Sequence, residues 1–471
     1  MQFENWGNTQ KLDFVMYADF ECLLKKPVGD NHFGKTTVTQ EHVPMSYCYL
    51  VKASEDVPTE LMDQFDIPQS PVVYRGNANS EANDVPKHFI QSITDVARKI
   101  EQLLKINTPI CMTSQNESNH KSIVNGGKCP LCKCKFSLTN NPVRDHHHLS
   151  GRYRQTVCNW YNLKMQTSKF VSCIMHNLSS YDSHIIINEL GHDSHTINVI
   201  PNSEEKFISF SKYISNRFSI RFLDSYRFMA SSLEKLANNL ARSDKTKFRS
   251  VINVYGEDDL DMVTRKGVYC YDYTDSWEKL EEQCLPPIEQ FFSSLTEKNI
   301  SQDDYKHAQN VWKRFKFKTL GEYSLWYNEL DVHILCDVFE AFRELYLKTY
   351  EIDCCHYYTI PGMSFDVCLK YTEAKLELIS DYDMLFMFEQ GVRGGICQAS
   401  KRYSKANHSK APVYNLEEPN RWITYLDATN LYGLAMSHTI PTGNFKWYEG
   451  NLSVKSVQNR LDRIDKIGKT G

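Results

Sequence analysis

The sequence predicts an α/β fold: a mixed sheet flanked by helices, interrupted by an inserted module and followed by a second, smaller part. Three observations support this. Short apolar runs alternate with stretches of helical spacing over most of the chain, one internal segment differs sharply in composition, and the pattern changes again near residue 351. The expected boundaries are 1–106 and 171–350 for the two parts of the main domain, 107–170 for the insert, and 351–471 for a linker and the smaller domain.

The first part of the main domain begins with an apolar run over 12–20, which predicts a strand ending near Asp19 and Glu21. Side chains alternate between the two faces of a strand, so these two carboxylates are expected to project from one face. The next elements expected are strands over 43–51 and 71–75 and a helix over 85–106, where apolar residues recur at helical spacing.

The second part of the main domain opens with an apolar run over 170–178 that predicts a strand leading into a turn. A long amphipathic pattern over 320–350 predicts a helix that carries Tyr327 and Asp331 four residues apart, hence on one face. The other elements expected are helices over 181–191 and 231–241, strands over 196–200, 206–210 and 218–223, a loop-rich segment over 242–276, and an irregular entry into further helix at Pro286 and Pro287.

The insert is recognised by composition. Residues 107–128 are rich in Asn, Ser, Thr and Gly, and residues 129–170 hold seven Lys and Arg against one acid, a local charge of +6. Cys129 and Cys132 have C-x-x-C spacing, which is a strong half-site for zinc, and Cys158 is a candidate third ligand. The fourth zinc ligand stays open: Cys134, a histidine or a water molecule could complete the site.

The smaller domain begins with a turn-forming linker near 354–364 and a helix expected over 364–379. A flexible pair, Gly394 and Gly395, follows beside Arg393. The run over 421–427 predicts a strand with Asp427 at its end.

Bulk composition is that of a globular protein. The hydrophobic share is 41%, the charged share 24% and the net charge −4, with a pI near 6.5, so any nucleic-acid surface must be local. The first ten residues lack a signal-peptide pattern and no apolar run reaches membrane-spanning length, so a soluble intracellular protein without membrane contact is expected, nuclear or cytoplasmic. The 15 cysteines are then expected to be reduced thiols or metal ligands.

The carboxylates carry the chemistry. A two-metal nuclease holds cations roughly 3.5–4 Å apart with several carboxylates. A single acid is more often a surface residue or a helix cap. As a set, Asp19, Glu21, Asp182 and Asp331 supply the ligands for Mg²⁺ or Mn²⁺, and Tyr327 is placed to orient the attacking water.

These acids lie in strings that resemble family B DNA polymerases. YADFE at 17–21, N-x-x-x-Y-D at 177–182 and Y-x-x-x-D at 327–331 resemble, in order, the three exonuclease motifs of the proofreading domain, and YLDATNLYG at 425–433 resembles polymerase motif A. Ser232 and Leu233 fit an element of the protein-primed branch. The resemblance is to the organellar, viral and Polinton-type members and covers nearly the whole chain.

The resemblance implies a fold and roles. The main domain would be an RNase H-like 3′–5′ exonuclease and residues 351–471 the beginning of a palm. Asp427 would hold a polymerase metal, and the Tyr432 ring would stack under the incoming deoxynucleotide. The residues implied to contact DNA are Asn177, Tyr181, Ser232, Leu233, Arg393, Gly394 and Gly395.

The sequence departs from the family pattern in places that remove no metal ligand. Asn430 stands where Ser is usual, Gly433 where Pro is usual, Val392 where Tyr is usual and Cys22 where Thr is common. YDYTDS at 271–276 mimics the string of the second palm carboxylate but precedes Asp427, so we interpret it as a spacer. With one palm carboxylate present, the chain is expected to be an amino-terminal fragment or a truncated gene copy.

The insert resembles the zinc-supported ββα-metal fold of recombination endonuclease VII. That resemblance implies that Asp145 and Asn162 bind a divalent ion and that His146 activates water. A zinc-stapled, basic insert that contacts DNA without cutting it is an equal alternative.

The function expected is template-directed DNA synthesis with 3′–5′ proofreading, acting on DNA and deoxynucleotides, with a terminal protein as a possible primer. Two other classes stay open. A stand-alone metal-dependent exonuclease would need only the four acids, and a non-catalytic zinc-dependent DNA-binding protein would need only the insert.

Overall fold

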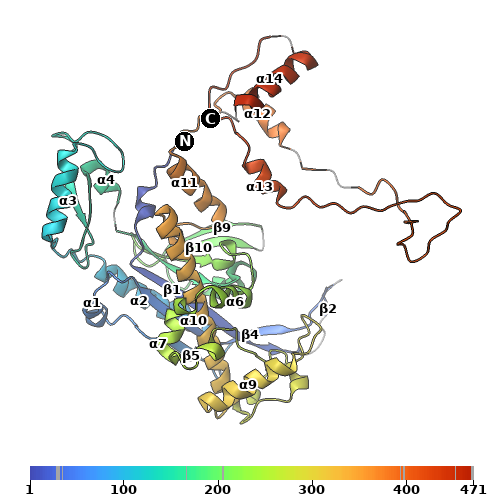
Figure 1. Cartoon of the computed structure of the whole chain (residues 1–471). Coiled ribbons are helices and arrows are strands. Elements are labelled where there is room, and N and C mark those ends of the chain that lie inside the picture. Colours follow the sequence, from blue (N-terminus) through green and yellow to red (C-terminus); the bar gives the residue numbers. More distant parts are fainter. Residues whose placement is uncertain are drawn as a thin grey trace. The chain divides into compact units, whose positions relative to one another are not determined.

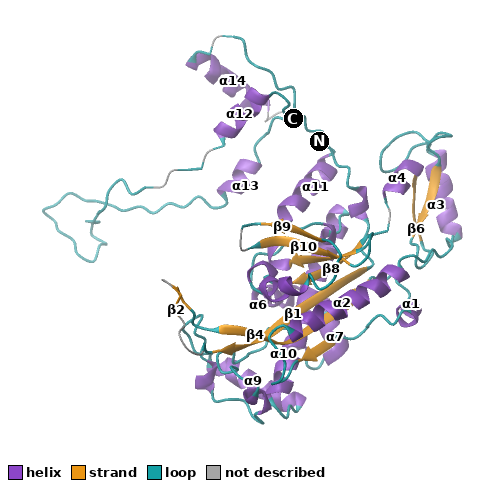
Figure 2. Cartoon of the chain, turned by 180° about the vertical axis from the view of Figure 1, so that it is seen from behind, coloured by secondary structure: helices purple, strands orange, loops and turns teal. Residues whose placement is uncertain are grey.

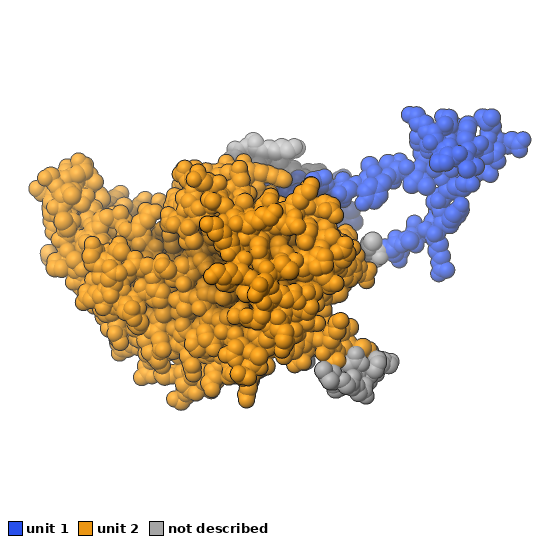
Figure 3. Space-filling view, turned by 90° about the horizontal axis from the view of Figure 1, so that it is seen from below, with its two compact units in different colours: residues 1–3, 372–471 blue, residues 4–371 orange. Residues whose placement is uncertain are grey.

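The structure is a computed structural model that describes residues 1–27, 32–33, 36–165, 167–203, 206–392, 394–395, 398–450 and 452–467. It divides into two compact units, one of residues 4–371 and one of residues 1–3 with 372–471, coloured separately in Figure 3. The larger unit is called the body below. It contains the sheet, the insert and all of the candidate exonuclease residues.

A seven-stranded mixed sheet forms the centre of the body, as the sequence predicts (Figure 2). Its central strands run parallel to one another and the outer strands are antiparallel to their neighbours. In spatial order the strands are β5 (Val72–Arg75), β4 (Glu41–Ala53), β1 (Phe14–Lys25), β8 (Phe170–Met175), β11 (Ser219–Asp224), β10 (Phe207–Tyr213) and β9 (Ile197–Pro201). A separate short pair joins β2 (His32–Phe33) to β3 (Thr36–Thr37).

Two long helices cover opposite faces of the sheet, and β1 shows the division residue by residue. Phe20 of β1 packs against Phe89 of α2 (Asp84–Leu103), with ring centroids 4.8 Å apart. Tyr17 instead meets Phe339 of α10 (Leu320–Tyr350), at 6.2 Å. Because neighbouring side chains of a strand point to opposite faces, every odd-numbered residue from 15 to 21 lies toward α10. The predicted pairing of Asp19 and Glu21 on one face is therefore confirmed.

The smaller helices of the body correct two expectations. The segment 242–276 is not only loop, because α7 (Arg249–Tyr255) forms where the carboxylate of Asp337 in α10 accepts both the Ser250 and Val251 N–H groups. The helix expected over 181–191 is split into a short α-helix and a 3-10 turn. Outside the insert, the other described α-helices of the body are α1 (Thr59–Gln64), α5 (Asp182–Ile186), α6 (Leu233–Ser243), α8 (Leu260–Val263), α9 (Gln302–Phe315) and α11 (Ile360–Thr372).

Helix α11 begins and ends earlier than the 364–379 expected. It stops at Thr372 because Glu373 takes a positive φ of 53°, which no helical residue has. Within the described residues, no helix has both the length and the apolar character needed to cross a bilayer.

The insert is a small ββα unit with its own core. A hairpin of β6 (Pro142–His146) and β7 (Tyr153–Cys158) leads into α4 (Asn159–Lys164), and α3 (Ser114–Asn125) packs on β7. Figures 1 and 2 both show these elements grouped together. The small core contains Cys129, Val157, Cys158, Tyr161 and Met165.

Polar contacts attach the insert to the rest of the body. His147 Nε2 lies 2.8 Å from Asp13 Oδ1, just before β1, and Arg152 donates to Asp56 at 2.6 Å. The insert is therefore tied to the start of the strand that carries Asp19.

The second unit lacks the strand expected over 421–427. Among its described residues only an isolated bridge joins Arg421 to Asn407, and the residues that follow have no strand partner. Tyr425 is 90% and Leu426 87% exposed, so most of the apolar run that predicted a buried strand is open to solvent here, although Trp422 stacks on His408 with ring centroids 3.7 Å apart. The helices of this unit are α12 (Tyr382–Gly391), α13 (Leu431–Met436) and α14 (Val454–Ile467).

Candidate functional site

Four acids from three elements gather at one place in the body. Carboxylate oxygens of Asp19, Glu21 and Asp331 all lie within 4.8 Å of one another. Asp182 is near enough to raise the pKa of Glu21 electrostatically. These four residues, called the acidic cluster below, are brought together from positions more than 300 residues apart in the chain.

The sheet topology explains the meeting. Strands β1, β8 and β11 are parallel, so their carboxyl ends lie at the same edge. Asp182 follows β8 at that edge, and Asp19 and Glu21 occupy the second half of β1. The register of β1 against β4 shifts between Glu21 and Cys22, and such a bulge re-aims side chains next to a site. Asp331 reaches the cluster from α10, the helix that covers this face of the sheet.

The cluster is electrostatically strained. Burial, followed by the charge of Asp331, raises the pKa of Asp19 to about 7. Burial is also the first cause that raises the pKa values of Glu21, Asp182 and Asp331, with neighbouring acids adding to it for the first two. Like charges in a buried site cannot all ionise without a counter-charge, so the arrangement calls for a cation.

The donor set fits divalent metals. Asp182 Oδ1 and Asp331 Oδ1 are buried and have no hydrogen-bond partner, although most buried polar atoms have one. Mg²⁺ and Mn²⁺ prefer carboxylate oxygens. A bound Mg²⁺ or Mn²⁺ would give these two buried oxygens the partner that they lack.

Lys266 is a neighbour that the sequence did not reveal. Its Nζ lies 3.3 Å from Asp331 Oδ2, and its side chain is 34% exposed. Opposing burial, the charge of Asp331 raises the pKa of Lys266 well above its ordinary value. Residues 266 and 331 have no motif spacing, so only the fold could bring them together.

Tyr327 lies one turn before Asp331 within an aromatic wall. Its hydroxyl is 2.6 Å from the hydroxyl of Tyr271, and its ring stacks on Tyr269 with centroids 5.1 Å apart. A Cβ on Gly267 would lie 2.7 Å from this ring, so only glycine allows the close approach. The segment 271–276, interpreted as a spacer, therefore also contributes Tyr271 to the site.

The residues expected to hold DNA lie in the turn after β8 and at the start of α6. Asn177 has a left-handed φ of 63° in the turn after β8, and Tyr181 directly precedes Asp182. Ser232 caps α6 by accepting the Lys235 N–H, which also makes it a structural residue, and Leu233 is 7% exposed.

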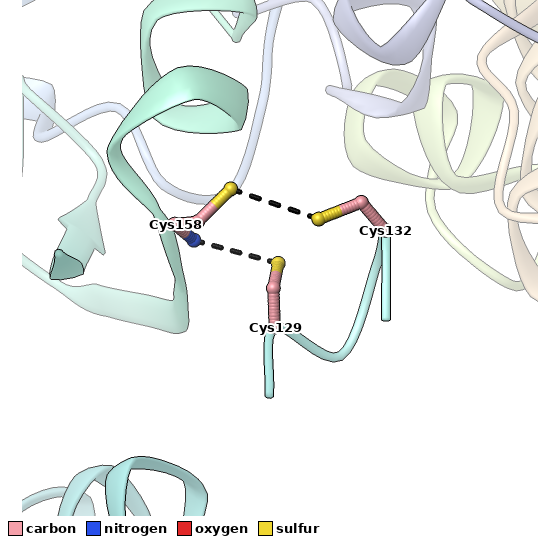
Figure 4. Close-up of side chains that lie close together, drawn as sticks. All are labelled: Cys129, Cys132 and Cys158. Carbon is pink, nitrogen blue, oxygen red and sulfur yellow. Dashed lines mark hydrogen bonds between the residues drawn. The ribbon is translucent and has the colours of Figure 1, made fainter. Parts of the chain in front are cut away.

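The three predicted zinc ligands meet in the insert (Figure 4). Cys132 Sγ and Cys158 Sγ are 3.7 Å apart, and the Cys158 N–H donates to Cys129 Sγ at 3.4 Å. Tetrahedral Zn–S bonds of ≈ 2.3 Å would separate two sulfurs by about 3.8 Å. Among the described residues, no fourth Cys, His, Asp or Glu has a ligand atom within 4.8 Å of all three sulfurs, although Cys134 lies close to Cys132.

The thiol environment also favours a metal. Burial raises the pKa of Cys129, but the backbone N–H groups of Cys132, Cys158 and Leu131 outweigh it and lower the pKa below its ordinary value. Burial raises the pKa of Cys132 to about 12. Backbone N–H groups that point at a cysteine sulfur favour its thiolate, the form that binds a metal ion.

Asp145, His146 and Asn162, the residues expected to form a nuclease in the insert, each have surroundings of a different kind. Both oxygens of Asp145 accept hydrogen bonds from Arg154, at 2.8 and 3.0 Å. His146 has a buried Nε2 without a hydrogen-bond partner, and its ring lies 5.1 Å from that of His148. Asn162 lies on α4 and its carbonyl accepts the Met165 N–H.

The polymerase residues lie in the second unit. Asp427 and Tyr432 are exposed, as are Gly394 and Gly395, and Arg393 lies outside the described residues. Asn430 has a left-handed φ of 53° and caps α13 by accepting the Gly433 N–H. A proline at 433 would have no N–H to donate, so the departures at 430 and 433 form one linked pair.

Comparison with known families supports the motif-based resemblance. The family described as DNA polymerase type B, organellar and viral, matches residues 165–470, which is well over half of the chain. The matched range includes Asp182, Asp331 and Asp427, whereas Asp19, Glu21 and most of the insert precede it. No curated protein and no solved structure shows significant similarity to the chain.

Proposed function

The chain belongs to the organellar and viral family of type B DNA polymerases, enzymes that act on DNA and deoxynucleotides with divalent metals, and on that premise we propose that its body is a 3′–5′ proofreading exonuclease with an RNase H-like sheet. The acidic cluster carries the proposal, because it holds three buried carboxylates and the half-buried Asp19 with too little positive charge to balance them. The mixed sheet that presents the acids from a parallel centre supports it further.

The residues have distinct roles in this proposal. The four acids hold Mg²⁺ or Mn²⁺, which would supply an activated water and stabilise the leaving oxygen. Tyr327, anchored by Tyr271, orients that water. Asn177, Tyr181, Ser232 and Leu233 hold the 3′ end of single-stranded DNA by stacking and phosphate contacts, which need no base readout.

The test is digestion of a 5′-labelled single-stranded oligonucleotide in Mg²⁺. The wild-type chain is expected to give a ladder that shortens from the 3′ end, and Asp19→Asn with Glu21→Gln is expected to abolish it while keeping side-chain shape. Asp303→Asn is the matched control, because Asp303 is an exposed acid of α9 outside the cluster. Digestion that persists in the double variant would refute the proposal.

The second unit carries the synthetic part of the proposal. Asp427 holds a polymerase metal, Tyr432 stacks under the incoming deoxynucleotide, and Arg393, Gly394 and Gly395 link the two activities along the DNA. The Ser232 and Leu233 element supports the protein-primed type, with a terminal protein as primer. Inclusion of Asp427 in the family match favours this over a stand-alone exonuclease.

In the insert, Cys129, Cys132 and Cys158 are proposed to hold Zn²⁺. The sulfur spacing and the N–H groups around Cys129 support this. Cys134 lies close enough to Cys132 to influence its pKa, so either Cys134 or a water completes the shell. Zinc content of the purified chain is expected to be near one per molecule and to be lost in Cys129→Ser, while Cys284→Ser, an exposed cysteine elsewhere, retains it. A zinc-free wild-type chain would refute the site.

Of the two roles left open for the insert, DNA contact without cleavage is favoured. Arg154 occupies both oxygens of Asp145, which would otherwise bind the nuclease ion together with Asn162. Lys128, Lys133 and Lys135 are exposed for phosphate contact. In the Asp19→Asn, Glu21→Gln background, circular duplex DNA is expected to stay uncut in Mg²⁺ or Mn²⁺. Nicking that disappears with His146→Ala would establish the nuclease instead.

A further inference from the structure

His42 lies beside the acidic cluster and has no role in the proposed reaction so far. It belongs to β4, where its register partner is Leu24 of β1, three residues beyond Glu21. Its Nδ1 is 2.8 Å from the hydroxyl of Tyr181, and the two rings meet edge to face with centroids 5.5 Å apart.

Tyr181 needs such a partner. Its backbone, with φ −138° and ψ −78°, belongs to neither helix nor strand, and it joins a 3-10 turn to α5. No regular element therefore fixes the direction of its ring. The contacts of the side chain itself must do so, and the next residue is the metal ligand Asp182.

The hydroxyl of Tyr181 is held from two sides. Tyr181 is half-buried, its hydroxyl lies between His42 and the Cys22 thiol, and the phenol has one proton to donate. Burial lowers the pKa of His42, which favours the neutral ring with a free acceptor nitrogen. Tyr181 donating to His42 Nδ1 is the arrangement that both environments support.

The segment that presents His42 is itself fastened to the site. Gln40 donates to Asp272 Oδ1 at 2.5 Å, and Asp272 follows Tyr271, which contacts Tyr327. The bulge between Glu21 and Cys22 sits in the same pair of strands. Hydrogen bonds therefore connect the start of β4, which carries His42, to the aromatic residues around Tyr327, although the two segments are far apart in the sequence.

We propose that His42 is a positioning residue that, through its hydrogen bond to Tyr181, fixes the ring against which the 3′-terminal nucleotide of single-stranded DNA stacks. The inference rests on the proposed exonuclease. His42 touches neither the metal ions nor the bond that is cut, so it governs how well DNA is held and not the rate of the chemical step.

Steady-state digestion of a single-stranded oligonucleotide by the full chain tests this. His42→Ala and Tyr181→Phe, which removes only the hydroxyl, are each expected to raise KM about 10-fold, as loss of one hydrogen bond would, with kcat changed less than about 3-fold. The double variant is expected to be no worse than either single variant, because both remove the same bond.

Two further variants keep the test decisive. His42→Asn retains a polar group at the end of a side chain of similar reach and is expected to recover most of the affinity. His438→Ala is the matched control, since His438 is an exposed histidine of the second unit. Thermal unfolding of each variant reports whether the body remains folded.

The outcomes separate the two proposals. If the wild-type chain digests DNA and His42→Ala has unchanged KM, or if the effects of His42→Ala and Tyr181→Phe multiply, the role of His42 is wrong and the exonuclease stands. If kcat falls and KM does not, His42 acts on the chemistry and the positioning role is wrong. If the wild-type chain digests nothing, the exonuclease itself fails.

Discussion

Helix α10 contributes an acid to each of two carboxylate groups in the body that are treated in opposite ways. In its first half, Asp331 meets Asp19 and Glu21, and among the described residues the positive charge beside them is that of Lys266, at 3.3 Å from Asp331 and partly exposed. Three turns later, Arg343 binds Asp353 through two hydrogen bonds of 2.8 and 2.6 Å and also reaches Glu340. Tyr17 of β1 donates to Glu340 as well, so both groups join the same helix to the same strand.

The two groups of acids differ in whether the protein itself supplies their counter-charge. Arg343 outweighs burial and lowers the pKa of Asp353 to about 2, so this acid is satisfied by the protein alone. The acidic cluster has its pKa values raised and two buried oxygens unpartnered, so it is satisfied only by something that the chain does not contain. Asp353, which is paired with Arg343, therefore stabilises the fold. The acids of the cluster, which lie beside one another, are arranged to bind a cation.

The largest effect is expected from removing one ligand of the cluster. Asp331→Asn should slow single-turnover digestion of DNA by about 10³-fold, because charge stabilisation by a bound metal is worth several kcal/mol and each 1.36 kcal/mol is a factor of ten. The same variant should leave the metal-free protein at least as resistant to urea as the wild type, because a strained charge has been removed. A variant that unfolds more easily without metal would contradict the comparison.

The next effect is on stability alone. Asp353→Asn removes the buried carboxylate that accepts two hydrogen bonds from Arg343 and leaves Glu340 as its acidic partner, so the free energy of unfolding should fall by about 3 kcal/mol. Urea denaturation measures it. Where the variant remains folded at low temperature, its rate of DNA digestion should stay within a few-fold of the wild type. A full loss of digestion in a folded variant would show that the arginine group serves the reaction directly.

The two groups should also respond oppositely to pH. A raised pKa, as for Asp19 at about 7, adds stability that is present at low pH and lost as pH rises through 7. The lowered pKa of Asp353 adds stability that is present above about pH 4 and lost toward pH 2. Between pH 5 and 8 the metal-free wild type should therefore lose roughly 2–3 kcal/mol of unfolding free energy, and Asp19→Asn should reduce that loss. Saturating Mg²⁺ should remove it, whereas an unchanged slope would assign the titration to other groups.

The sequence was sufficient for the parts of the fold that repeat a simple period. The strands around Asp19 and the long helix through Asp331 were predicted because their apolar spacing matches the structure. The strand expected over 421–427 did not form, since a strand depends on partners that the local pattern cannot show. Helix α7 was missed for a similar reason, because its cap is Asp337 from a distant element.

The site shows the same limit. Motif order identified the four acids and the three cysteines, because those residue types occur at recognisable spacings. Lys266, Tyr271 and His42 have no such spacing, and each becomes visible only by its contact with Asp331, Tyr327 or Tyr181. The partnership of Asp145 with Arg154 was equally hidden, although the two residues are nine apart on neighbouring strands.

The smallest expected effect comes from a comparison of Lys266 with Arg343, the positively charged residues of the two carboxylate groups. Lys266→Met should change the unfolding free energy of the metal-free protein by less than about 1 kcal/mol, because a third of the side chain is exposed and solvent screens its pair with Asp331. Arg343→Met is the matched comparison: its side chain is 2% exposed and its loss leaves Asp353 buried and uncompensated, which should cost about 3–5 kcal/mol. Urea denaturation of both variants decides it. Equal losses would mean that Lys266 is as much a structural counter-charge as Arg343, and the acidic cluster would then be partly satisfied before any metal binds.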